Sequence, residues 1–333
     1  MNYFSIIFTG TTLLSLILFS LALKRTKTKS ALIKRQGGLL LALVCLGGIS
    51  GLFFFFDDSG ILPKDYWSMA AAGMVMIAGG MIDDRFNLKP GWQFLYQALA
   101  AIIILAAGDT INHIRLPGWG VVNLPGIINY FLSFWWIILV INAFNWFDGM
   151  DGMAGGVGFI GFLIIFFLSL TPLVAQPQTA AICIITAGGL LGFLFFNFYP
   201  AKIYLGTAGS GFIGLMLALV SIYSGAKVAT AALVLGIPIL DLIYVTYERI
   251  KLGIKPWRGG DRLHLHYRLA DAGVSQRTII VLMYGASAAL GIAALNLQTG
   301  GKMIIGILLI VVFGILIAGL EKFFLKKHEK EKN

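Results

Sequence analysis

Charged residues are scarce in this sequence, and their scarcity is the first limit on what the protein can be. Only 12% of the 333 residues are Asp, Glu, Lys or Arg, whereas 58% are hydrophobic. A soluble domain does not need so large an apolar surface, so the composition predicts a protein surrounded by a lipid bilayer. Cysteine is also scarce. Cys45 and Cys183 each lie in an apolar run without ligand-type neighbours, which excludes a cofactor motif built on cysteine spacing.

The apolar runs lack the alternation of a membrane barrel, so their backbone polar groups must be satisfied within helices. We therefore expect an all-α polytopic membrane protein whose residues 1–320 form a single integral membrane domain, followed by a charged tail at 321–333. Eleven spans are predicted, over residues 3–23, 38–56, 66–82, 92–107, 127–146, 154–174, 178–197, 208–224, 226–247, 277–297 and 302–320.

Positive charge is nearly absent from one set of loops. No positive side chain precedes the first run, and Lys24 and Arg25 follow it, which predicts a retained span with its N-terminus outside. With that orientation 21 of the 25 Lys and Arg residues lie inside, so the C-terminus is expected in the cytoplasm. Because the net charge of +10 is spread along one membrane face, nucleic acid is not an expected partner.

The loops richest in Asp, His, Arg and Gly fall on the predicted cytoplasmic side, where we expect the active site. The first of them, "MIDDRFN", contains Asp83 and Asp84. Adjacent carboxylates repel, so they call for a cation such as Mg²⁺ or Arg85, or for a raised pKa in one of them. A solvated loop start is the alternative interpretation of this pair.

The second acidic segment is "NAFNWFDGMDGMAGG", which contains Asp148 and Asp151. On a helix this spacing places both carboxylates on one face, about 5–6 Å apart at Cβ. Two such groups can hold a divalent ion whose other ligands are waters and phosphate oxygens. Asn142 and Asn145 repeat the spacing and can bind substrate by hydrogen bonds without adding charge. Polar contacts between helices, with a glycine packing face, are the alternative.

The segment "GTAGSG", from Gly206 to Gly211, opens the eighth expected span. Small residues at a helix N-terminus present free N–H groups and the positive end of the helix dipole, which together form a phosphate cradle. The candidate binding residues are Gly206, Thr207, Gly209 and Ser210. The segment lacks the lysine of a P-loop. A plain loop with Ser210 as the N-cap is the alternative.

The loop "KPWRGGDRLHLHYRL" offers cationic and imidazole donors at Arg258, Arg262, His264, His266 and Arg268. Two histidines at this spacing, with no Cys or third His nearby, make a poor zinc pair. Arginine and histidine are better interpreted as donors to phosphate or sugar oxygens, and a topology-setting basic loop is the alternative. Asp241 is an intramembrane carboxylate that could face the protein interior or orient this loop.

Four ordered segments, "MIDDRFN", "NAFNWFDGMDGMAGG", "YLGTAGSGFIG" and "DRLHLHYRL", resemble the motifs of the polyprenyl-phosphate N-acetylhexosamine-1-phosphate transferases. The resemblance spans about residues 40–275, and the HxH-type loop looks more like the GlcNAc-1-phosphate branch. It implies a reaction of a UDP-N-acetylhexosamine, expected to be UDP-GlcNAc, with undecaprenyl phosphate. The products are the undecaprenyl-diphospho-sugar, which starts a surface polysaccharide such as O-antigen or teichoic acid, and UMP. Mg²⁺ is the implied cofactor, with Mn²⁺ as a substitute, and a homodimer is common in the family. The resemblance also implies a multi-pass protein of the bacterial cytoplasmic (inner) membrane.

Carried over by motif position, the resemblance implies catalytic roles for Asp83, Asp84 and Asp148. Asp83 would position or deprotonate the lipid phosphate with Asp84 beside it. Asn145, Asp148 and Asp151 would surround the nucleotide and the metal, with Asp148 and Asp151 as its ligands. The histidines and arginines of the basic loop would hold the diphosphate and the sugar.

Two positions depart from the family pattern. Thr207 stands where the family has an aspartate at the metal, and a threonine cannot replace that charge. Tyr267 stands where the basic motif usually ends in a second histidine. Thr207 leaves three readings open: an inactivating substitution, a metal ligand moved to Asp148 or Asp151, or a lineage that has lost catalysis and binds lipid or nucleotide sugar. A transporter of lipid-linked sugars is a further alternative, which magnesium-dependent UMP release would exclude.

Overall fold

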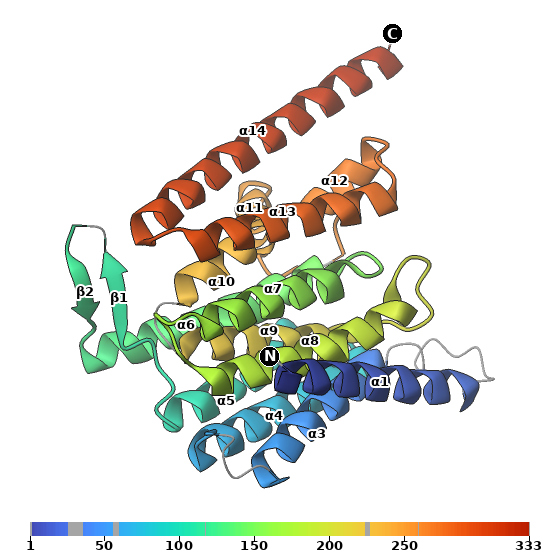
Figure 1. Ribbon diagram of the computed structural model, residues 1–333. Helices are drawn as coiled ribbons and strands as arrows, with labels where there is room; N and C mark the ends of the chain where they lie inside the picture. Colours follow the sequence, from blue (N-terminus) through green and yellow to red (C-terminus); the bar gives the residue numbers. More distant parts are fainter. Residues whose placement is uncertain are drawn as a thin grey trace.

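The computed structural model is almost entirely helical and describes residues 2–25, 36–55, 60–116, 118–223, 227–258 and 260–332. Among these residues the one sheet is a two-stranded antiparallel hairpin. In chain order (Figure 1), the elements are α1 (Asn2–Arg25), α3 (Gly37–Phe55), α4 (Pro63–Phe86), α5 (Pro90–Ala106), β1 (His113–Leu116), β2 (Gly120–Asn123), α6 (Gly126–Phe147), α7 (Met153–Leu170), α8 (Pro177–Asn197), α9 (Gly206–Ile222), α10 (Val228–Val234), α11 (Gly236–Lys251), α12 (Leu265–Asp271), α13 (Gln276–Asn296) and α14 (Thr299–Lys332).

Within the described residues, seven helices are long and apolar enough to cross a membrane: α1, α3, α6, α7, α8, α13 and α14. The pair α10 and α11 reaches the same standard as a unit but bends by 72° between the two helices. This is the architecture of an all-α polytopic membrane protein. Each of the eleven expected ranges overlaps a helix, but α4, α5 and α9 are not among the seven helices that meet this standard. The count of eleven spans and the orientation of the termini therefore stay predictions.

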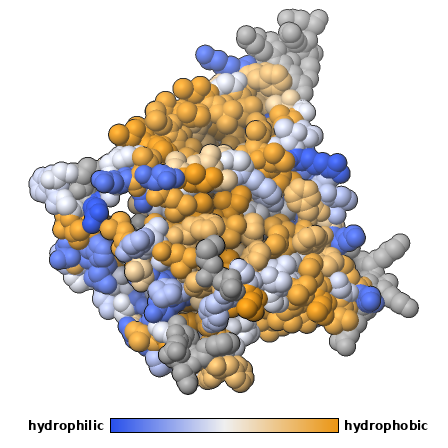
Figure 2. All heavy atoms as spheres, in the orientation of Figure 1, coloured by the Kyte–Doolittle hydropathy of each residue, from blue (hydrophilic) through white to orange (hydrophobic). Residues whose placement is uncertain are grey.

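The outer surface of the helices is suited to lipid. Figure 2 shows hydrophobic side chains over most of the visible face. In α14, which lies along one edge of the molecule in Figure 1, Ile304, Ile307 and Ile315 are each about 60% exposed or more. Such surface is costly in water but neutral against acyl chains. The helix α14 continues to Lys332, so the backbone of the expected charged tail is helical.

α9 is the central helix of the bundle. Every residue from Ala208 to Ile222 is buried, and the helix packs against α3, α4 and α6. Two glycines permit the close approach at its first turn, because a Cβ at Gly38 would lie 2.2 Å from Gly209 N and a Cβ at Gly80 would lie 2.3 Å from Ala208 Cα. This contact brings the start of α9 against the end of α4, where the paired aspartates lie.

Two local expectations and one alternative interpretation differ from the structure. Asp148 and Asp151 do not share a helical face, because α6 ends at Phe147 and a non-helical turn precedes α7, whose N-cap Gly152 has a φ of +78°. Ser210 is not an N-cap. Helix α9 already begins at Gly206, and Ser210 Oγ lies one turn inside, 3.0 Å from Gly206 O. The expected span 226–247 is divided between α10 and α11 at Leu235, with residues 224–226 outside the described part.

Candidate active site

A polar pocket of about 870 Å³ opens where the α4–α5 connection, the end of α6 and the segment after α11 meet. It gathers side chains that are far apart in the chain, among them Gln93, Asn145, Asp148, Arg258, His264 and Tyr267. Four of these, Asn145, Asp148, Arg258 and His264, are residues that the sequence marked as candidates. The pocket therefore joins one acidic motif with the basic loop.

Asp148 supplies a negative charge to the pocket. It caps the C-terminus of α6 and is partly buried, and no other described residue donates a hydrogen bond to its carboxylate. Removal from water, together with the charges of Asp84 and Asp151, raises the pKa of Asp148 to about 7. A carboxylate in this setting is stabilised in its charged form by a cation.

Asp151 anchors the turn that carries Asp148. Its Oδ2 accepts a hydrogen bond of 2.9 Å from Ala201 N, in the segment after α8. Asn197 Oδ1 accepts a second bond, of 3.0 Å, from Gly152 N. Because both bonds connect the turn to the end of α8, the two aspartates hold separate positions. Asp148 faces the pocket, and Asp151 faces the neighbouring segment.

The paired aspartates at the end of α4 are bound to backbone. Asp83 is 5% exposed, and its Oδ1 accepts hydrogen bonds from Leu88 N at 2.7 Å and from Gln93 Nε2 at 3.0 Å. Asp84 accepts bonds from Thr207 N at 2.9 Å and Ala208 N at 3.2 Å, in the first turn of α9. The N–H groups expected to cradle phosphate are thus directed at Asp84. Gln93 and Leu88 connect Asp83 to the pocket wall, which they both line.

The two asparagines lie at different depths. Asn142 exchanges hydrogen bonds with Gln97 of α5, with Nδ2 2.8 Å from Gln97 Oε1, and this pair does not line the pocket. Asn145 lines the pocket, and its Nδ2 donates to Ser210 Oγ at 3.1 Å. Gly209 does not reach the pocket either and packs against Leu205 and Gly38.

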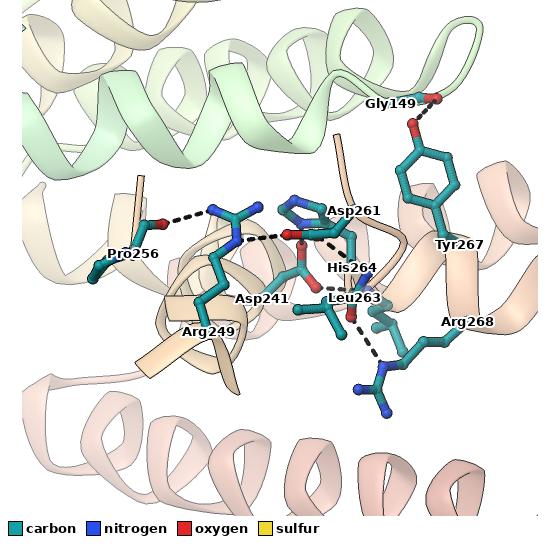
Figure 3. A network of polar contacts seen from close by, with 10 residues as sticks. Gly149, Asp241, Arg249, Pro256, Asp261, Leu263, His264, Tyr267 and Arg268 are labelled. Atoms are coloured by element: carbon teal, nitrogen blue, oxygen red, sulfur yellow. Dashed lines mark hydrogen bonds and ion pairs between the residues drawn. The ribbon is translucent and has the colours of Figure 1, made fainter. Parts of the chain in front are cut away.

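His264 reaches the pocket from the N-cap of α12, where a buried carboxylate holds it (Figure 3). Asp241, on α11, is 1% exposed. Its Oδ2 lies 2.6 Å from His264 Nδ1, and its Oδ1 accepts a bond of 2.7 Å from Leu265 N. The expectation that Asp241 could orient the basic loop agrees with this geometry.

A second buried contact holds the same loop. Arg249, 2% exposed, donates from Nε to Asp261 Oδ2 at 2.8 Å and from Nη1 to Pro256 O at 2.7 Å. Its guanidinium lies over the ring of Trp146, 4.5 Å from the centroid. Burial raises the pKa of Asp261, but the hydrogen bond and charge of Arg249 oppose this and hold it below its usual value. Residues 249–264 are therefore fixed at both ends.

His266 and two of the arginines lie outside the pocket lining. Both ring nitrogens of His266 are buried without a hydrogen bond, and burial lowers its pKa to about 4. The ring stacks on His264, with centroids 5.4 Å apart, and fills the space beside Gly149. Arg262 pairs with Asp271, and Arg268 donates to Leu263 O. Of the three candidate arginines, only Arg258 lines the pocket.

Several lining residues were not among the sequence candidates: Gln93, Trp146, Arg249, Lys255, Trp257 and Asp261. Arg249 and Lys255 carried a signal, since both lie in the basic stretch after the ninth expected span. The tryptophans and Gln93 carried none, because similar residues occur at many membrane boundaries.

The donor set suits a small hard cation. No cluster of three or more His, Cys, Asp or Glu side chains with metal-binding geometry occurs among the described residues. Magnesium does not require one, because it binds through one or two carboxylates and keeps waters and phosphate oxygens as its other ligands. An unpaired carboxylate at Asp148, with the charges of Asp84 and Asp151 nearby, matches this requirement.

The fold and the pocket define a multi-pass membrane protein with a cleft, lined by both acidic and basic side chains, at the end of its helix bundle. A family model described as glycosyl transferase family 4 matches residues 66–225. The probable undecaprenyl-phosphate N-acetylglucosaminyl 1-phosphate transferase of Bacillus subtilis is 28% identical over 298 residues, which cover 87% of this chain and 80% of the relative.

Two further relatives carry related names. The decaprenyl-phosphate N-acetylglucosaminephosphotransferase of Mycobacterium tuberculosis is 30% identical over 281 residues, covering 75% of this chain and 68% of the relative. The undecaprenyl-phosphate alpha-N-acetylglucosaminyl 1-phosphate transferase of Salmonella typhi is 26% identical over 276 residues, covering 77% and 72%. The chain belongs to glycosyl transferase family 4, among the polyprenyl-phosphate N-acetylhexosamine-1-phosphate transferases.

Proposed function

We propose that this chain transfers GlcNAc-1-phosphate from UDP-GlcNAc to undecaprenyl phosphate and releases UMP, as the first membrane step of a surface polysaccharide. The observation that supports this most is the pocket of about 870 Å³ in which the unpaired Asp148 lies with Arg258 and His264. A carboxylate for a metal and cationic donors for phosphate are what a diphosphate substrate requires. The relatives named above act on polyprenyl phosphates.

The chain's own residues would divide the work as follows. Arg258 and His264 donate to the diphosphate and the sugar, and Asn145 orients the nucleotide beside them. Asp83, held next to the pocket wall by Gln93 and Leu88, positions or deprotonates the lipid phosphate. The lipid enters from the bilayer, and the nucleotide sugar enters from the cytoplasm, which the opening of the pocket would face.

Asp148 and Asp151, with Asp84 nearby, are the residues that would hold Mg²⁺. The bound ion would supply positive charge that offsets the repulsion between two phosphates and the charge on departing UMP. Asp148 would contribute an oxygen to which no donor in the described part of the chain is hydrogen-bonded. Asp151 and Asp84 also bind backbone N–H groups, which fix the directions of their remaining oxygens.

UMP release tests the proposal. Purified protein in detergent is given UDP-GlcNAc and undecaprenyl phosphate with and without Mg²⁺, and the chain is compared with Thr207→Asp and the uncharged control Thr207→Asn. We expect magnesium-dependent UMP release from the chain and a rate about tenfold higher or more in Thr207→Asp, because a restored carboxylate strengthens metal binding. The lipid product is identified by mass.

Two outcomes would overturn the proposal for this chain. Activity in Thr207→Asp alone would mean that the pocket is a transferase site disarmed at Thr207, and the chain would be a binding homologue. Silence from all three proteins with every UDP-N-acetylhexosamine tried would remove the transferase function, and transport of the lipid-linked sugar across vesicles would then be measured.

A further inference from the structure

The contact between Asp241 and His264 determines which hydrogens the imidazole carries. Leu265 N donates to Asp241 Oδ1 at 2.7 Å, so the carboxylate is an acceptor on that side. Its other oxygen, Oδ2, lies 2.6 Å from His264 Nδ1. An ionised carboxylate has no hydrogen to donate, so the hydrogen in the second contact belongs to Nδ1.

The opposite ring nitrogen is the one that remains for the pocket. His264 lines the pocket, and within the described residues no protein group is hydrogen-bonded to its Nε2. Trp146 meets the ring edge to face at 6.0 Å, and His266 stacks on it at 5.4 Å, so the ring cannot turn without displacing both neighbours. The direction of Nε2 is therefore fixed by the packing of the ring, and its tautomer is set by the contact between Asp241 and Nδ1.

We propose that Asp241 is a positioning residue that fixes His264 in the Nδ1–H state and holds Nε2 toward a phosphate oxygen of the substrate. This inference rests on the proposed function, since the phosphate is that of the nucleotide sugar. When the nucleotide sugar binds, the imidazole takes a proton from water onto Nε2 and donates it in a hydrogen bond to the phosphate oxygen, and Asp241 stabilises the resulting positive charge. The carboxylate acts through His264 and does not touch the substrate.

Asp241→Asn isolates this role. The asparagine Oδ1 can still accept from Leu265 N, so the loop keeps its anchor, whereas the NH₂ group now donates to His264 Nδ1. The neutral imidazole must then carry its hydrogen on Nε2, and it loses the anionic partner that stabilises its positively charged form beside a phosphate. Two variants serve as controls. Asp241→Glu keeps a carboxylate at this position, and Asp109→Asn changes a buried carboxylate that does not line the pocket.

The tautomer is measured by ¹⁵N NMR of histidine-labelled protein in detergent, with His264→Gln used to assign the signal among the 4 histidines. We expect the Nδ1–H signature in the parent protein and in Asp109→Asn, and the Nε2–H signature in Asp241→Asn. The affinity for UDP, measured by calorimetry, is expected to fall about 10–100-fold in Asp241→Asn and in His264→Gln. The double variant is expected to bind no more weakly than either single variant.

The two arms separate the inference from the proposed function. An unchanged tautomer, or unchanged UDP affinity, in a folded Asp241→Asn protein overturns the positioning role even if UMP release is intact. If Asp241→Asn fails to fold, Asp241→Glu is decisive, because retention of the Nδ1–H state supports the role and its loss contradicts it. A third outcome is that the tautomer switches in Asp241→Asn but the parent protein neither binds UDP nor releases UMP. That result would contradict the proposed function and the phosphate as the ligand of His264.

Discussion

Asp84 caps α9 by accepting the backbone N–H of Thr207 at 2.9 Å. The carboxylate is also close to Gly206, where a Cβ would lie 2.6 Å from its Oδ2, so the glycine is needed for the contact. A negative charge at a helix N-terminus is favourable because the unsatisfied N–H groups carry partial positive charge. The junction of α4 and α9 therefore contains one carboxylate, Asp84. The resemblance expects a second carboxylate beside it, at the position of Thr207.

Thr207→Asp is expected to make the thermal stability of the protein depend on Mg²⁺. The new carboxylate lies near Asp84, and like charges in a partly buried site destabilise the fold. A bound cation relieves that repulsion, so the unfolding temperature should be lower than the parent's without Mg²⁺ and should recover as Mg²⁺ is added. Tryptophan fluorescence during heating, at several Mg²⁺ concentrations, measures the effect.

The matched control for this prediction is Thr207→Asn, which has nearly the shape of aspartate without its charge. Its unfolding temperature should respond to Mg²⁺ no more than that of the parent. An equal response in the aspartate and asparagine variants would show that the cation does not bind near residue 207.

Gly149→Ala is expected to destabilise the protein by about 1–3 kcal/mol and to distort the pocket. A Cβ at this position would lie 2.2 Å from His266 Nε2, and the ring, which is 1% exposed, has little room to move. Chemical unfolding in detergent measures the loss. Gly285→Ala is the control, because nothing lies within 4 Å of a Cβ there and alanine favours the helix.

The origin of the Gly149 effect can be checked with a second substitution. His266→Ala removes the ring that the new methyl group would meet, so the double variant should be destabilised by less than the sum of the single variants. Strict additivity would mean that the turn itself, and not the contact with His266, rejects a side chain at residue 149.

Much of the fold could be predicted because a bilayer imposes long apolar helices, and each expected span overlaps a helix of the structure. The break between α10 and α11 could not be predicted in this way, since Gly236 and Pro238 lie in an otherwise continuous apolar run. The turn at Asp148 was missed for a related reason. Its glycines were interpreted as a packing face between helices, although Gly152 also takes a positive φ that ends the helical path.

In the candidate site, residue types identified the chemistry but not the geometry. The aspartates were selected as metal ligands and the basic loop as a source of phosphate donors, and Asp148, Arg258 and His264 do meet in one pocket. Sequence spacing could not show that Asp84 and Asp83 are occupied by backbone N–H groups, or that Arg262 turns to Asp271. Those contacts depend on tertiary packing between segments more than a hundred residues apart or on a local turn.

Asp109 is expected to make stability fall as the pH rises from about 4 to about 6. It follows α5, near the N-terminal end of α4 and away from the pocket, and burial, with the charge of Asp65, raises its pKa to about 6 although Lys64 and Ser68 oppose the shift. The folded protein therefore holds a proton there that the unfolded chain has already released, so unfolding becomes easier across this pH range. Above pH 6 the contribution is constant.

Asp109→Asn should remove this dependence and should be at least as stable as the parent at pH 8, because a neutral amide is cheaper to bury than a carboxylate. Asp261→Asn gives the contrast, since Arg249 holds the pKa of Asp261 below its usual value and the loss of that charge should cost stability at pH 8. Unfolding temperatures between pH 4 and pH 8 test both. A parent whose stability does not change relative to Asp109→Asn across this range would contradict the prediction.

Arg249→Lys is expected to loosen the loop that forms one wall of the pocket, because a lysine cannot reproduce the planar arrangement of donors. Arg249 bonds Asp261 and Pro256 while it lies over Trp146, so the change should cost about 2 kcal/mol of stability and weaken UDP binding. Arg262→Lys is the matched control. Its side chain is 60% exposed beside Asp271, where water screens the ion pair, so this change should cost little stability. Equal losses in the two variants, measured by unfolding and by UDP calorimetry, would mean that the buried arginine does not hold the loop.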